Sequence, residues 1–526
     1  HFHYVLCLSE AKGMNIIMLV KIILLILFFG CMIAVGLYAR KSANSMTDFV
    51  LGGRSVGPWL SAFAYGTSYF SAVVFVGYAG QFGWKYGLAS TWIGLGNAVI
   101  GSLLAWVAMG RRTRVMTHHL EVATMPDFFG KRYDSNILRV VASAIAFVFM
   151  IPYTASVYNG LSRLFGMAFD IPYTVCVVTM AVLTGVYVIL GGYMATAIND
   201  FIQGIIMLFG IVAVIGAVLS GQGGFIEAVR KLSELPSDVP VTLGQQGAFA
   251  SFFGTDPLNL LGVIILTSLG TWGLPQMVHK FYAIKSEKAI KTGTIVSTFF
   301  AVIVSGGCYF LGGFGRLFDA PELYKADGSI MYDAIIPAML STLPDILIGI
   351  VIILVLSASM STLSSLVLTS ASTLTLDFIK GNIVKDMDDK KQLIYIRVLI
   401  VFFIVVSVVL ALNPPTFIAQ LMGISWGALA GAFLAPFLYG LYWKGVTRAG
   451  VWASFVCGVG ITVSNMYFKF IASPINAGAA AMIVGLIVTP VVSLISPKIN
   501  SSFVDKIFQC YDNTAKVSSK EYLKED

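Results

Sequence analysis

Charged residues are scarce in this chain of 526 residues, where Asp, Glu, Lys and Arg together make up 11%. A soluble globular protein carries about 25% charged residues, whereas 57% of this chain is hydrophobic. The composition excludes an ordinary soluble protein and indicates an all-α polytopic membrane protein embedded in a lipid bilayer. The net charge of +8 is not gathered into basic faces, so nucleic-acid binding is not expected.

Residues that build metal centres and disulfides are few as well. The chain has five histidines and six cysteines, and their spacing matches neither a zinc site nor a disulfide framework. His118 and His119 are adjacent, so they would point apart on a helix, and no nucleophile elbow is present. We therefore do not expect an enzyme.

Long apolar runs are abundant instead and predict thirteen membrane-spanning helices. The predicted spans are 16–39, 57–79, 87–109, 138–166, 172–192, 198–220, 255–280, 290–315, 345–376, 394–412, 415–441, 449–470 and 477–496. The first thirteen residues, HFHYVLCLSEAKG, differ from the rest, and we interpret Met14 as the true start.

Lysine and arginine gather in the loops that follow odd-numbered spans. These loops hold Arg111, Arg112 and Arg114, then Lys285, Lys288 and Lys291, then Lys380, Lys385, Lys390 and Lys391. Lys280 is interpreted as the residue that enters the loop after the seventh span. Loops after even-numbered spans are poorer in basic residues. The positive-inside rule places the basic loops in the cytoplasm. We therefore expect a cell-membrane protein with its N-terminus outside and its C-terminus inside.

The ninth predicted span is crowded with hydroxyl groups, in the stretch LSASMSTLSSLVLTSASTLTLD at 356–377. Lipid offers these groups no partners. Ala358, Ser361, Thr362 and Ser365 recur at i, i+3, i+4 and i+7, which places them on one helix face. Uncharged oxygen ligands suit a hard monovalent cation such as sodium. Hydroxyl groups that merely help helices to pack are the alternative, and this helix alone leaves both open.

Two of the predicted spans, the second and the seventh, are interrupted, and they lie five spans apart. The second reads AFAYGTSYFSAVVFVGYAG at 62–80, and the seventh reads TSLGTWGLPQM at 267–277. Paired interrupted helices point to a transporter site near the membrane midplane. Because five is odd, spans 2–6 and 7–11 would insert with opposite topology. Kinks without a binding role are the alternative.

Four stretches together resemble the sodium:solute symporter family, which contains sodium–proline, sodium–pantothenate, sodium–sialic acid and sodium–glucose symporters. They are DFVLGGRSVGPWLSA at 48–62, GGYMATAINDFIQG at 191–204, STLSSLVLTSASTLTLD at 361–377 and GLYWKGVTRAG at 440–450. The resemblance implies one transmembrane domain with a LeuT-type 5+5 inverted repeat. Its parts would be a leading helix at 16–39, repeats at 57–220 and 255–441, trailing helices at 449–496 and a cytoplasmic tail at 497–526.

The resemblance also implies where sodium binds. A shared sodium site would use the backbone carbonyls of Thr67, Phe70 and Ala358 and the hydroxyls of Ser361 and Thr362. The sialic-acid branch has a second sodium site, whose matching residues here are Asp200, Ser364 and Ser365. For Asp200 the alternative is a helix cap at the start of the sixth span.

A solute would lie between the broken helices, against Tyr69, Ser71, Trp272 and Gln276. Tyr and Trp offer flat apolar faces with a polar tip, but the same residues could serve only packing. The stretch TWGLPQM at 271–277 lacks the longer aromatic run of the sodium–proline branch and looks closer to the pantothenate branch. Where the sugar branch has polar residues on the first broken helix, this chain has Tyr69, Val73 and Val74, which argues against a hexose.

The expected function is uptake of a small organic solute, of amino-acid or carboxylate type such as pantothenate or sialic acid, driven by inward sodium flow. We expect a monomer or a weak oligomer. The alternative function is a LeuT-fold membrane sensor without net transport, although a tail of about thirty residues cannot hold a kinase core.

Overall fold

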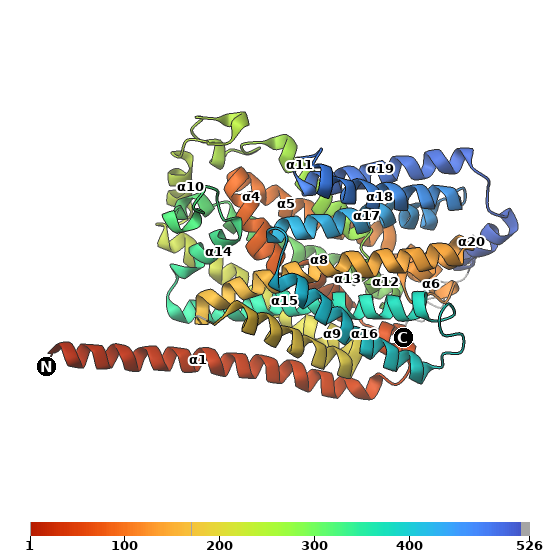
Figure 1. The fold of residues 1–526 in the computed structure, drawn as a ribbon, viewed down its shortest axis with the longest axis horizontal. Helices are drawn as coiled ribbons and strands as arrows, with labels where there is room; N and C mark the ends of the chain where they lie inside the picture. Colours follow the sequence, from red (N-terminus) through yellow and green to blue (C-terminus); the bar gives the residue numbers. More distant parts are fainter. Residues whose placement is uncertain (1, 170, 517–526) are drawn as a thin grey trace.

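Helices make up most of the chain in the computed structural model, which describes residues 2–169 and 171–516 (Figure 1). Backbone within lipid must satisfy its own hydrogen bonds, and a helix does so inside one segment. Among the described residues, β structure is confined to isolated bridges such as that between Val56 and Ile284.

The α-helices are α1 Phe2–Ala39, α2 Met46–Leu51, α3 Pro58–Tyr69, α4 Ala79–Tyr86, α5 Thr91–Gly96, α6 Arg111–His119, α7 Met125–Arg132, α8 Asn136–Phe169, α9 Tyr173–Gly221, α10 Phe225–Ser233, α11 Pro257–Leu269, α12 Pro275–Ala283, α13 Glu287–Gly312, α14 Tyr332–Ser341, α15 Asp345–Thr373, α16 Asp389–Leu412, α17 Ile418–Tyr442, α18 Arg448–Phe468, α19 Pro474–Ile495 and α20 Ser501–Lys516. Short 3₁₀ and π segments connect several of them.

The described part of the chain has ten helices that are long and apolar enough to cross a membrane, or eleven if the bent pair α11 and α12 counts as one span. The thirteen predicted spans are thus not seen as thirteen separate helices. Val73–His119 has 47 residues and α9 has 49, and each covers parts of two predicted spans. At 1.5 Å per residue a straight α9 would measure about 74 Å, more than twice the roughly 30 Å of a bilayer core. It bends at Gly192, whose φ is 54°.

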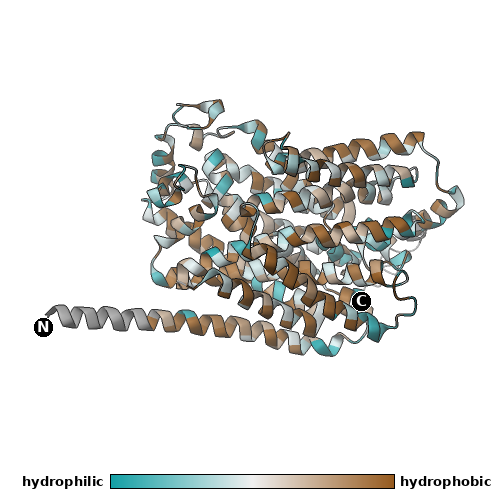
Figure 2. Ribbon diagram, viewed as in Figure 1, coloured by the Kyte–Doolittle hydropathy of each residue, from teal (hydrophilic) through white to brown (hydrophobic). Residues whose placement is uncertain are grey.

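Hydrophobic residues run along most of the long helices of the bundle (Figure 2). Phe209 on α9 is 75% exposed, and Ile295 on α13 and Leu494 on α19 are also largely exposed. Contiguous exposed surface of this kind is disfavoured in water and suits contact with lipid. These findings describe a multi-pass membrane protein, while the predicted orientation of its two ends stays a prediction.

Both predicted interruptions are breaks in helical structure. α3 ends at Tyr69, Phe70 is extended at φ −93° and ψ 119°, and the chain becomes helical again in a π segment, Val73–Tyr78. α11 and α12 meet at a 40° bend, where Leu274 is extended and Pro275 starts the next helix. Each of the two predicted repeats, 57–220 and 255–441, therefore begins with a broken helix. The division of the chain into these repeats stays a prediction.

Close packing around the first broken helix depends on glycine. Gly83 of α4 faces Gly312 of α13, and a Cβ atom on Gly312 would overlap the carbonyl oxygen of Ala79. Backbones can approach this closely only where no side chain intervenes, as is common between membrane helices. The contact fixes the second half of the broken span against α13.

We predict that Gly312→Ala lowers the melting temperature of the purified protein, because α4 must move away from α13 at a cost of roughly 1–3 kcal/mol. The matched control is Gly306→Ala on the same helix, where a Cβ atom meets nothing within 4 Å. Alanine is favoured over glycine inside a helix by about 1 kcal/mol, so this variant should melt at the same temperature or higher. Equal losses in both variants would contradict the packing explanation.

Candidate functional site

The hydroxyl-rich face of α15 lies against the broken end of α3. Ser361 Oγ is 3.0 Å from the carbonyl oxygens of Thr67 and Ala358. Thr362 Oγ1 is 3.2 Å from the carbonyl oxygens of Thr67, Phe70 and Ala358. All five residues are buried. The structure thus brings together every residue that was expected to form the first sodium site.

This cluster has more acceptors than hydrogens. Two hydroxyl groups carry two hydrogens, so Ser361 and Thr362 cannot donate at once to all the carbonyl oxygens around them. The carbonyls of Thr67 and Phe70 are available because the helix ends at this point. Buried, uncharged oxygen atoms in excess of donors are ligands for a hard cation.

The three residues of the second expected site are placed differently from one another. Ser364 Oγ donates to the carbonyl oxygen of Ser361 at 2.9 Å. Ser365 Oγ lies 2.7 Å from Ser68 Oγ and accepts a hydrogen bond from Lys280 Nζ at 2.9 Å. Neither carboxylate oxygen of Asp200 has a hydrogen-bond partner. That these residues bind sodium stays a prediction.

Lys280 was expected at the mouth of a loop, and this interpretation is wrong. Its side chain is only 2% exposed and lies in α12, among the helices. The predicted span ends at this residue, whereas the helix continues to Ala283. The available signal was the lysine itself, because an ionisable residue inside a membrane segment is by default functional.

Asp200 does not cap a helix, so the alternative reading of this residue is also wrong. It lies well inside α9, and the break in that helix is at Gly192. The residue is fully buried and has no positive helix end beside it. Its carboxylate is therefore buried without the positive helix end that the capping hypothesis required.

The expected solute contacts surround the two breaks. Tyr69 donates its hydroxyl hydrogen to the carbonyl oxygen of Thr267 at 3.2 Å, which joins the first broken helix to the second. Trp272 Nε1 donates to the carbonyl oxygen of Ile100 at 2.9 Å, and Ser71 Oγ accepts from the amide of Val73 at 3.1 Å. Three of the four residues thus have partners within the chain.

Gln276 is the exception, because it is 1% exposed and neither its amide nitrogen nor its amide oxygen has a partner. It is the second residue of α12, directly after the break. A buried amide without partners costs roughly 1–3 kcal/mol. A ligand that formed hydrogen bonds with this amide would remove the cost.

Two aromatic residues that the sequence did not single out complete this region. Trp426 of α17 has its ring centroid 5.7 Å from that of Tyr69 and 5.8 Å from that of Tyr153 of α8. The indole nitrogen of Trp426 is buried and has no hydrogen-bond partner among the described residues. Nothing in the apolar stretch around Trp426 distinguishes it from a packing residue, so no sequence signal could have identified it.

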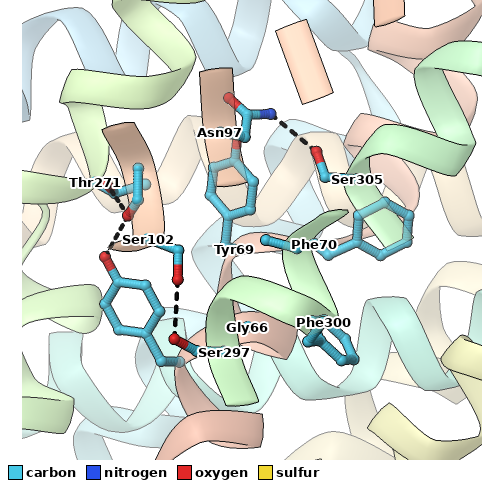
Figure 3. Close-up of a pocket in the computed structure, with 12 residues that line it drawn as sticks. Gly66, Tyr69, Phe70, Asn97, Ser102, Thr271, Ser297, Phe300 and Ser305 are labelled. Atoms are coloured by element: carbon cyan, nitrogen blue, oxygen red, sulfur yellow. Dashed lines mark hydrogen bonds between the residues drawn. The ribbon is translucent and has the colours of Figure 1, made fainter. Parts of the chain in front are cut away.

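A small enclosed cavity lies beside the broken end of α3 (Figure 3). Tyr69, Phe70 and Thr271 reach it from the two breaks, and Asn97 donates to Ser305 Oγ at 2.9 Å on its wall. Its volume is about 10 Å³, which is room for about one water molecule. None of its twelve lining residues is charged. A solute could enter only if these side chains move apart.

Comparisons with known proteins bear on the family and on the fold. The sequence profile of the sodium:solute symporter family matches residues 49–458. The chain is 29% identical to the sodium/proline symporter of Staphylococcus aureus strain JH9 over 91% of this chain and 92% of the relative, and equally similar to that of strain NCTC 8325 / PS 47.

Among solved structures, a sodium-coupled sialic acid symporter in its substrate-bound, outward-open state is similar in fold. The TM-score is 0.73 at 17% identity, over 91% of this chain and 99% of that chain. At this identity the likeness shows the fold alone.

We predict that Gln276→Leu raises the melting temperature of the purified protein measured without solute. Leucine has a similar size and removes a buried amide that lacks partners, so it should stabilise by about 1 kcal/mol or more. The control is Gln392→Leu on α16, where the amide nitrogen donates to Met387 at 2.8 Å, and this variant should melt at a lower temperature. A lower melting temperature for Gln276→Leu would mean that its amide is satisfied within the protein.

Proposed function

The chain belongs to the sodium:solute symporter family, and on this premise we propose that it couples inward sodium flow to the uptake of a small organic solute by alternating access. The relatives named above are symporters, which is consistent with transport and not with an enzyme. The observation that carries the proposal is the cluster of surplus oxygen atoms between α3 and α15.

In the proposed mechanism one sodium ion binds Ser361, Thr362 and the carbonyl oxygens of Thr67, Phe70 and Ala358. These ligands come from two elements, so the bound ion holds the broken end of α3 against α15. A ligand shifts a conformational equilibrium by as much as its affinity differs between the two states. Sodium therefore favours the state in which both elements meet, and separation of α3 from α15 releases it.

The driving force is sufficient for accumulation of a solute. One charge that crosses a potential of 100 mV releases about 2.3 kcal/mol, before the sodium concentration gradient is added. A factor of ten in concentration corresponds to about 1.4 kcal/mol. For a solute without net charge, such as a zwitterionic amino acid, a single sodium ion thus supports accumulation by more than tenfold; for an anionic carboxylate the two charges cancel and only the sodium concentration gradient drives uptake.

The solute is proposed to be a small amino acid or carboxylate that lies between the two breaks, near Tyr69, Ser71, Trp272 and Gln276. Support comes from the small, uncharged cavity beside Tyr69 and from the unpartnered amide of Gln276. The relatives are named sodium/proline symporters, so proline is the first candidate to test. Pantothenate and sialic acid are the next.

We predict that Ser361→Ala and Thr362→Val each weaken sodium binding at least tenfold, because each removes an oxygen ligand worth about 1.4 kcal/mol or more. The measurement is the sodium concentration that gives half of the maximal stabilisation in a thermal-shift titration. Ser372→Ala is the control, since Ser372 is also buried on α15 and its hydroxyl has no partner. Unchanged sodium affinity in both test variants would place the ion elsewhere.

We also predict that the correct solute raises the melting temperature strongly only when sodium is present. A ligand at one hundred times its Kd stabilises by about 2.7 kcal/mol, and coupling requires that sodium increase the affinity for the solute. Proline, pantothenate and sialic acid are screened with sodium and with choline in its place. Uptake into proteoliposomes then separates transport from the alternative of a sensor, which would bind both ligands without net uptake.

A further inference from the structure

Lys280 and Asp200 form a pair of opposite charges buried in the bundle. Lys280 is 2% exposed and Asp200 is fully buried. The ammonium group of Lys280 faces the ring of Tyr193, and Asp200 follows Tyr193 by seven residues on α9, which places both on one helix face. Neither oxygen of Asp200 has a hydrogen-bond partner among the described residues. Charges within a membrane segment are expected to be paired in this way.

The ammonium group of Lys280 is held in a defined place. It donates to Ser365 Oγ at 2.9 Å and lies 5.1 Å from the centroid of the Tyr193 ring, a distance at which an aromatic face attracts a cation. Ser365 Oγ in turn lies 2.7 Å from Ser68 Oγ. Oxygen and aromatic groups thus surround the ammonium as they would surround a bound cation.

This position coincides with the second sodium site that the sequence led us to expect. Ser365 belongs to that expected site and accepts the hydrogen bond of Lys280, and Asp200 lies on the face of α9 that carries Tyr193, against which the ammonium group is placed. A sodium ion bound to Ser365 would lie next to the ammonium group, and the like charges would repel each other.

We propose that the ammonium group of Lys280 is a resident cation that takes the place of a second sodium ion, so that the chain binds one sodium ion per transport cycle. The proposal rests on the proposed function, sodium-coupled symport. It deepens that function by fixing the number of coupling ions.

The ammonium group of Lys280 is linked, through Ser365, to the same two helices, α15 and α3, that the proposed sodium ion would join. Ser68 adjoins Thr67, whose carbonyl oxygen belongs to the first site, and Ser365 follows Thr362 by three residues on α15. Lys280 lies on α12, after the second break. The chain of contacts from Lys280 through Ser365 to Ser68 therefore links both broken helices to α15. Because Lys280 is part of the chain, its ammonium group is not released with sodium. It stays in the site when the empty transporter returns to its outward-facing state.

The test counts sodium ions. Binding of radioactive sodium to the purified protein is measured at equilibrium for the wild type, Lys280→Ala, Asp200→Asn and the double variant. We expect one ion per chain and a Hill coefficient near 1 for the wild type. Lys280→Ala leaves the Asp200 carboxylate unpaired and opens space beside Ser365, so we expect two ions and a Hill coefficient clearly above 1.

The remaining variants act as controls. The double variant Asp200→Asn with Lys280→Ala removes both charges, so the number of ions should return to one. Lys85→Ala replaces another lysine, which lies over the ring of Tyr332 and far from α15 in sequence, and should also bind one ion. If Lys280→Ala does not fold, the neutral pair Asp200→Asn with Lys280→Met should fold, because no buried charge is left alone.

The outcomes separate this proposal from the one on which it rests. Two sodium ions bound to the wild type, with a Hill coefficient that falls in Asp200→Asn, would overturn the resident cation and support a second sodium site. One ion bound to both the wild type and a folded Lys280→Ala would overturn it as well. No sodium binding by the wild type would instead overturn the proposed function. One ion that is lost in Ser361→Ala with Thr362→Val would support that function independently of Lys280.

Discussion

The contact between the hydroxyl face of α15 and the broken end of α3 is the constraint on which the rest of the structure depends. A helix that stops within a membrane leaves carbonyl oxygens without partners, and no water is present in lipid to satisfy them. Here Ser361 and Thr362 lie against those oxygens. Two hydroxyls are too few to satisfy them all, and this shortage is what makes the place suitable for a cation.

The breaks themselves are held by neighbours that leave no room for side chains. Gly312 of α13 lies against the carbonyl of Ala79, just after the first broken span. Gly273 at the second break would collide with the backbone of α17 if it carried a Cβ atom. Close backbone contacts therefore hold both broken helices in place.

Buried charged residues are few, and one of them lies against the hydroxyl-rich face of α15. Lys280 donates a hydrogen bond to Ser365 there, while the small cavity at Tyr69 is lined only by uncharged residues. Gln276 and Trp426 lie near the two breaks, and their buried polar atoms have no partners among the described residues. A ligand that bound them would not have to break a hydrogen bond inside the protein.

The sequence by itself determined the helical membrane class, the two interruptions and the face shared by Ala358, Ser361 and Thr362, because hydropathy and helical spacing are local properties. It could not determine the number of separate helices, since the bend of α9 at Gly192 depends on packing. It also placed Lys280 at the entry to a loop and offered a helix cap as the alternative role of Asp200. Only the tertiary structure decided that α12 carries this lysine into the bundle, next to Ser365, because which side chains meet across distant helices is not written in any local pattern.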